Sequence, residues 1–210
     1  MREFDIAKLL LRINAVFLKP NDPFTWASGI KSPIYCDTRL VLGYPPIRER
    51  IESELANLIL EKFVDVEVIV GTSTGGIPHA AYVSDLLKLP MSYVRAKAKD
   101  HGRHSLIEGA LVDGKNVVVI EDLISTAGSV LDVVRTLKDA NACVMGIASI
   151  FTYELKKGIE NLQAEEITNY SLSNINALVR VALESKYIDD NGYRKINKFI
   201  KDPSDDTWME

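Results

Sequence analysis

Two short aliphatic segments, each ending in polar residues, constrain the fold of this chain more than any other feature. The first is VEVIVG at residues 66–71, and the second is NVVVIED at residues 116–122. A short, nearly continuous aliphatic run indicates a strand that is buried on both faces. Strands of this kind that alternate with helices favour a parallel sheet covered on both sides. We therefore predict an α/β fold with a mainly parallel central sheet flanked by helices.

Helical periodicity occurs before and between these strands. In residues 45–63, aliphatic side chains recur every three or four positions, at Ile47, Ile51, Leu55 and Leu58, as on one face of a helix. Other helices are predicted at residues 1–20, around Pro78, from about Ser129 to Ala140 and at residues 172–187, and other strands at residues 91–97 and 142–151.

The organisation of the chain contains no repeat and no long linker, and we expect one domain over residues 1–210. Residues 21–39 are rich in turn formers, and together with the first helix they predict an N-terminal flap within about residues 1–45. The pair Asn191-Gly192 is a turn signal, and the acidic tail from residue 201 is expected to be frayed or lightly docked.

Composition excludes several classes of protein. The formal net charge of -4 disfavours a general nucleic-acid binder, which needs a basic excess to neutralise phosphates. No apolar run approaches the roughly 20 residues that cross a bilayer, so no membrane interaction is expected. The first residues include Glu3 and Asp5 and make a poor signal peptide, which predicts a cytoplasmic protein. Cys36 and Cys143 are expected to be buried free thiols.

The second strand leads into an unusual polar segment. Two acids, Glu121 and Asp122, precede five small residues from Ser125 to Ser129, three of which carry hydroxyls. Ligands of parallel sheets bind beyond the carboxyl ends of the strands, and backbone N–H groups at a helix start favour phosphate. The two acids can bind sugar hydroxyls, so the segment fits a ribose 5-phosphate. A solvated sheet edge with Ser125 or Thr126 as a helix N-cap is the alternative.

This segment, VVVIEDLISTAGS, resembles the phosphoribosyl-pyrophosphate binding signature of type I phosphoribosyltransferases. The resemblance implies the type I phosphoribosyltransferase fold with a small N-terminal flap, or hood. It also implies that the acid pair contacts the ribose diol, with Mg²⁺ held nearby through substrate and water and without direct protein ligands. The residues implied to bind phosphoribosyl pyrophosphate here are Glu121, Asp122, Leu123, Ile124, Ser125, Thr126, Ala127, Gly128 and Ser129.

A cluster of cations stands out in this acidic chain. Within ten positions lie Arg95, Lys97, Lys99, His101, Arg103 and His104. Positioned cations can stabilise the charge that develops on a departing pyrophosphate, whereas a solvated basic loop is the alternative. The segment resembles the catalytic loop of orotate phosphoribosyltransferases, although Ala96 replaces a lysine found in many members. The resemblance implies that Arg95, Lys99 and His101 bind the substrate. Lys99 and His101 are predicted to be catalytic, with Asp122 steering the ribose.

Two further segments are similar to the same family. Residues 24–39 resemble the flap that covers the base, which implies orotate contacts from Tyr35 and Cys36 together with Ser125. Residues 71–76 resemble the pyrophosphate loop. Where some relatives carry lysines, this chain has Ala27 and Gly75.

Taken together, the resemblance implies transfer of a phosphoribosyl group from phosphoribosyl pyrophosphate to orotate in de novo pyrimidine (UMP) biosynthesis. The products are orotidine 5-phosphate and pyrophosphate, and family members form homodimers with shared active sites. Two alternatives stay open. A purine or uracil phosphoribosyltransferase would lack the flap, and a regulatory protein without turnover would usually add a basic extension.

Overall fold

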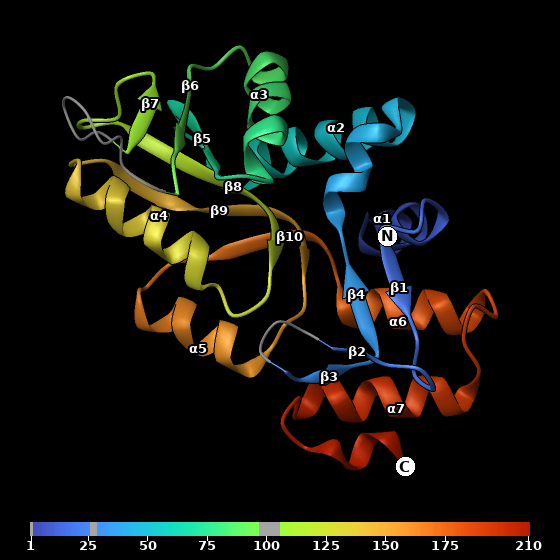
Figure 1. The fold of residues 1–210 in the computed structure, drawn as a ribbon. Coiled ribbons are helices and arrows are strands. Elements are labelled where there is room, and N and C mark those ends of the chain that lie inside the picture. Colours follow the sequence, from blue (N-terminus) through green and yellow to red (C-terminus); the bar gives the residue numbers. More distant parts are fainter. Residues whose placement is uncertain (1, 26–28, 97–105) are drawn as a thin grey trace.

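The computed structural model describes residues 2–25, 29–96 and 106–210, and its centre is a six-stranded sheet with the order β10-β9-β8-β5-β6-β7 (Figure 1). Four neighbouring pairs of this sheet are parallel, and β7 is antiparallel to β6 at one edge. The prediction of a mainly parallel sheet is confirmed. The strands are β5 (Val68–Thr72), β6 (Met91–Val94), β7 (Ile107–Gly109), β8 (Asn116–Ile124), β9 (Cys143–Thr152) and β10 (Asn169–Asn174).

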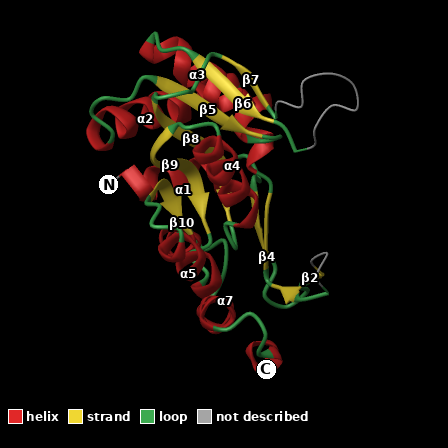
Figure 2. Ribbon diagram, turned by 90° about the vertical axis from the view of Figure 1, so that its left-hand side faces the viewer, coloured by secondary structure: helices red, strands yellow, loops and turns green. Residues whose placement is uncertain are grey.

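Helices cover both faces of this sheet (Figures 1 and 2). Successive side chains of β8 point to opposite faces, so Val118 and Ile120 join one hydrophobic core while Val117 and Val119 join the other. Each buried aliphatic side chain contributes about 1.5–3 kcal/mol. The first core contains α1 (Arg2–Arg12), α2 (Pro45–Lys62), α3 (Gly76–Leu87) and α6 (Ile175–Glu184), and the second contains α4 (Gly128–Asp139), with α5 (Lys156–Ala164) packed beside it.

The N-terminal segment forms two small antiparallel pairs beside the main sheet. These are β1 (Val16–Leu18) with β4 (Ile34–Cys36), and β2 (Phe24–Thr25) with β3 (Lys31–Ser32). A 3-10 helix, η1 (Thr38–Gly43), follows directly. Buried Ile34 packs in the same core as α1 and α2, so this segment is anchored to the body of the protein.

The C-terminal third differs most from the sequence prediction. The helix expected at residues 172–187 begins only at Ile175, because the preceding residues belong to strand β10. The predicted Asn191-Gly192 turn is wrong, since both residues lie in the first turn of α7 (Asp190–Lys201). The carboxylate of Asp189 caps this helix by accepting a hydrogen bond from the Gly192 amide at 2.7 Å, so the asparagine and glycine start a helix instead of reversing the chain.

The end of the chain packs onto the protein. It forms η2 (Asp206–Met209), in which Trp208 is only 1% exposed. The Trp208 ring meets the ring of Phe199 from α7 edge to face, with centroids 5.6 Å apart. Of the two states predicted for the tail, the frayed one is therefore wrong, because a large aromatic side chain anchors this segment to the protein.

The two cysteines have different surroundings, and both are free. Cys36 is half-buried, whereas Cys143 is exposed at the start of β9, so the prediction of burial was wrong for Cys143. Among the helices within residues 2–25, 29–96 and 106–210, none combines the length and apolarity needed to span a membrane.

We expect Trp208→Ala to lower the free energy of unfolding by about 3–5 kcal/mol, the usual cost of removing a buried aromatic side chain. Urea unfolding curves measure the change, and Met209→Ala is the matched control because that neighbouring side chain is 37% exposed. The control is expected to stay within about 0.5 kcal/mol of the unmodified protein. Equal midpoints for the two variants would show that the tail contributes nothing.

Candidate active site

The two acids, predicted as the last residues of their strand, lie inside strand β8, which is two residues longer than the sequence indicated. β8 continues to Ile124, and β5 pairs with it so that Gly71 stands opposite Ile120. This register brings Thr72, the last residue of β5, beside Glu121. The Thr72 hydroxyl donates to Glu121 Oε1 at 2.7 Å. The acid pair is thus held by the neighbouring strand at the carboxyl edge of the sheet.

Glu121 is an unusual carboxyl group. It is only 7% exposed, and burial, reinforced by the adjacent Asp122 side chain, raises its pKa to about 8. Hydrogen bonds from Thr72 and from the Asp122 amide act in the opposite direction without cancelling the effect. The pair therefore resists carrying two negative charges at neutral pH unless a cation or hydroxyl donors arrive.

The loop between β5 and α3 reaches the acid pair because it contains glycine. A Cβ on Gly75 would lie 2.4 Å from Asp122 Cγ, and one on Gly76 would lie 2.3 Å from the Ile120 carbonyl oxygen. Any side chain at either position would push this loop away from β8. The residues predicted as a pyrophosphate loop therefore touch the predicted sugar-binding acid directly.

The segment after β8 leads into α4 without a side-chain cap. Ala127 is the N-cap residue, with a left-handed backbone at φ 63°, and no hydrogen bond from a described side chain caps the helix. The alternative of Ser125 or Thr126 as the N-cap is wrong. The first N–H groups of a helix without such a cap can bind an anion, which agrees with a phosphate at this loop.

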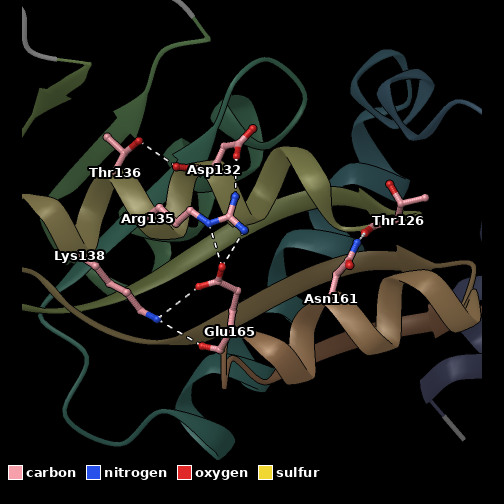
Figure 3. Close-up of polar contacts among 7 residues, drawn as sticks. All are labelled: Thr126, Asp132, Arg135, Thr136, Lys138, Asn161 and Glu165. Carbon is pink, nitrogen blue, oxygen red and sulfur yellow. Dashed lines mark hydrogen bonds and ion pairs between the residues drawn. The ribbon is translucent and has the colours of Figure 1, made fainter.

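Helix α5 packs against the loop that contains Ser125 and Thr126 (Figure 3). The Asn161 side chain donates to the Thr126 carbonyl oxygen at 2.8 Å, and a Cβ on Gly158 would lie 2.3 Å from the Ser125 carbonyl oxygen. Glu165, at the end of α5, accepts from Arg135 of α4 at 2.6 Å. The loop is therefore fixed between two helices that are themselves joined by an ion pair.

Arg95 follows β6 and lies near the start of α4. It lines a hollow of about 480 Å³ with Ser73, Gly128 and Ser129 among other residues. Its guanidinium is paired with Glu108 at 3.5 Å. The structure thus brings Arg95 to the predicted phosphate loop. The other five cations of this cluster lie outside the described residues: Lys97, Lys99, His101, Arg103 and His104.

Strand β4 brings Cys36 toward the acids. Burial raises the pKa of the Cys36 thiol, and the negative charges of Asp122 and Asp37 raise it further. Tyr35 points to the other side of the strand, because neighbouring residues alternate, and its ring lies 5.5 Å from that of Phe24. The predicted contacts of Tyr35, Cys36 and Ser125 with orotate stay predictions.

Sequence reasoning missed the contacts of three residues that hold the site together, although two of them, Thr72 and Thr38, lie in segments that it assigned to the site. Thr72 could have been found from the expected pairing of the two central strands, since both end at the same edge. Thr38, whose hydroxyl donates to Asp122 Oδ2 at 2.7 Å, lies in a segment with no periodic pattern. Asn161 belongs to α5, a helix that the sequence analysis did not predict.

Comparison with known proteins agrees with this geometry. The family described as phosphoribosyl transferase domain matches residues 45–186. Orotate phosphoribosyltransferases of Bacillus cereus (strain G9842) and Bacillus anthracis (strain CDC 684 / NRRL 3495) are each 54% identical over 205 residues, covering 98% of this chain and of each relative. The chain therefore belongs to the phosphoribosyltransferase family.

Solved structures show the same fold. UMP synthase of Leishmania donovani superposes with a TM-score of 0.80 at 25% identity, over 94% of this chain and 42% of that longer chain. Orotate phosphoribosyltransferase of Aeropyrum pernix superposes with a TM-score of 0.75 at 24% identity, over 88% of this chain and 99% of that one. Within its family, the chain groups with the orotate phosphoribosyltransferases, at 54% identity to the relatives named above.

The raised pKa of Glu121 predicts a specific pH dependence of stability. In the folded protein this group keeps its proton up to about pH 8, whereas in the unfolded chain it loses it near the ordinary pKa of about 4.3. The free-energy cost of burying the charged Glu121 carboxylate is thus absent below the ordinary pKa and complete above the raised pKa. Relative to Glu121→Gln, the free energy of unfolding is expected to fall between about pH 5 and 8 and then to level off.

Urea unfolding of both proteins at several pH values across this range and above it measures the difference. Glutamine keeps an oxygen that can accept from Thr72, so it is the conservative replacement. A difference that does not change with pH would show that Glu121 titrates normally.

Proposed function

We propose that this protein transfers the 5-phosphoribosyl group from phosphoribosyl pyrophosphate to orotate, giving orotidine 5-phosphate and pyrophosphate in pyrimidine biosynthesis. One observation carries the proposal. The acid pair, the loop at residues 71–76 and the uncapped start of α4 meet at one edge of the sheet. Acceptors for sugar hydroxyls, a backbone loop for pyrophosphate and N–H donors for a phosphate are the groups that this substrate requires.

In this mechanism the protein acts mainly through binding and orientation. Glu121 and Asp122 hold the ribose hydroxyls, and residues from Ser125 to Ser129 hold the 5-phosphate. Arg95 binds pyrophosphate, while Lys99 and His101 stabilise the negative charge that develops on it as the anomeric bond breaks. The flap covers orotate, whose ring nitrogen attacks the face opposite pyrophosphate.

The residues fit Mg²⁺ as a partner of the substrate. Within the described ranges, no cluster of three or more potential ligand side chains is present. Mg²⁺ commonly keeps several waters and binds substrate phosphates, so the ion would lie near the acids of β8 through substrate and water, without a direct protein ligand. When bound, the ion would neutralise the charge of the leaving group. Glu121 would then lose its proton more readily, because a nearby cation favours the charged form.

We further propose a homodimer with shared active sites. Support comes from the surface of η1 and α3, which leaves large apolar side chains exposed, because exposed aromatic and aliphatic groups favour contact with another protein. Its large exposed side chains are Leu40, Tyr44, Tyr82 and Leu86. A cytoplasmic location stays a prediction.

The reaction is tested by following the loss of orotate absorbance. We expect loss that requires phosphoribosyl pyrophosphate and magnesium, and that falls at least about 100-fold in Asp122→Asn, because a neutral amide is a weaker acceptor for sugar hydroxyls. Asp139→Asn is the matched control, since that side chain is exposed at the end of α4. Turnover of a purine or uracil but not of orotate would show that the proposed substrate base is wrong.

Shared sites are tested by mixing two inactive variants. Lys99→Ala and Asp122→Asn each remove one part of the site, and we expect each alone to be nearly inactive. If Lys99 acts in the site of the partner subunit, a mixed dimer contains one intact site, so equal mixing restores roughly a quarter of the activity per subunit. No recovery in a mixture shown by sedimentation to contain mixed dimers would place both residues in the same subunit.

A further inference from the structure

The Asp122 carboxylate is contacted from two sides by segments that are far apart in the sequence. The backbone of Gly75 lies against it, so closely that a Cβ there would be 2.4 Å from Oδ2. On another side, the Thr38 hydroxyl donates to Oδ2 at 2.7 Å. One contact comes from the loop after β5 and the other from the N-terminal segment.

Thr38 is itself firmly placed. It is only 1% exposed and is the first residue of η1. The preceding residue, Asp37, caps η1 by accepting from the Arg39 amide, and its own amide donates to the Ala15 carbonyl oxygen at 2.8 Å. Val41, one turn later, is fully buried in the core. The hydroxyl therefore comes from an anchored turn and not from a free loop.

We propose that Thr38 is a positioning residue for phosphoribosyl transfer: its hydroxyl fixes the orientation of the Asp122 carboxylate and ties the base-covering flap to the sugar-binding acid. This inference rests on the proposed function. The torsion that turns an aspartate carboxylate has broad preferences, so an unbound carboxylate samples many orientations. A hydrogen bond to one oxygen selects one of them before the substrate arrives.

The connection along the chain gives this bond a second consequence. Thr38 follows β4 after one intervening residue, and β4 carries Tyr35 and Cys36, which are predicted to contact the base. Base and sugar must meet at one bond-forming distance. A single hydroxyl that joins the flap to Asp122 therefore helps to set the position of the base relative to the sugar.

Thr38→Val tests the proposal because valine keeps the shape of threonine and removes the donor. We expect kcat to fall roughly 10- to 100-fold, since hydrogen bonds to ionised groups are stronger than neutral ones, while KM for phosphoribosyl pyrophosphate changes less than about threefold. Thr38→Ser restores the hydroxyl and is expected to recover most of kcat. Thr207→Val is the matched control, because Thr207 also donates to a carboxylate, that of Asp205 at 2.9 Å, in the distant tail.

A double-mutant cycle separates positioning from a general loss of structure. If Thr38 acts through Asp122, then Thr38→Val adds little to the defect of Asp122→Asn, and the combined variant is about as active as Asp122→Asn alone. Urea midpoints of all variants establish that they are folded at the assay temperature. Multiplied defects in the double variant would overturn the proposal.

Three other results would also overturn it: a Thr38→Val enzyme within twofold of the original kcat, a Thr38→Ser enzyme as impaired as Thr38→Val, or tighter binding of phosphoribosyl pyrophosphate by Thr38→Val. The last would show that the hydroxyl competes with the substrate for Asp122. Failure of the proposed function looks different, because the unmodified protein would then show no orotate turnover at all.

Discussion

The site depends on one constraint: two neighbouring carboxyl groups, those of the buried Glu121 and the half-buried Asp122, lie at the carboxyl edge of a parallel sheet. Burial raises the pKa of Glu121 to about 8, so the pair is poorly satisfied until a ligand arrives. Thr72, Thr38 and the Asp122 amide supply donors that make the arrangement tolerable. In the proposed complex, sugar hydroxyls and a cation would stabilise the charged forms of both carboxyl groups.

Glycine allows the rest of the site to form around these acids. Gly75 and Gly76 let the loop after β5 lie against β8, and Gly158 lets α5 lie against the predicted phosphate loop. In each case a Cβ would come within 2.4 Å of another atom. Backbone N–H groups can approach a phosphate only where side chains leave room, so close approach of the backbone recurs at this edge of the sheet.

The central sheet and the acid pair could be predicted from the sequence because their signals are local. Aliphatic runs such as residues 117–120 mark buried strands, and the chemistry of Glu121 and Asp122 can be interpreted from neighbouring residues. Thr38 and Asn161 could not be found in this way, since their partners lie 84 and 35 residues away. The β10 strand was missed for another reason: its sequence NYSLSN is mostly polar, because it lies at the sheet edge and does not show the aliphatic pattern.

The contrast between local sequence signals and contacts with distant residues also explains why the strand carrying the acids is longer than predicted. Polar residues usually end a buried strand, and Glu121 with Asp122 looked like such an end. Backbone pairing does not depend on side-chain polarity, however, and β9 runs beside β8 as far as Ile124 opposite Thr152. Two acids inside a paired strand are held more rigidly than two acids in a loop, and here β9 pairs with β8 along the segment that carries them. The strand is thus longer than predicted at the two residues that, in the proposed function, hold the sugar while the bond to pyrophosphate breaks.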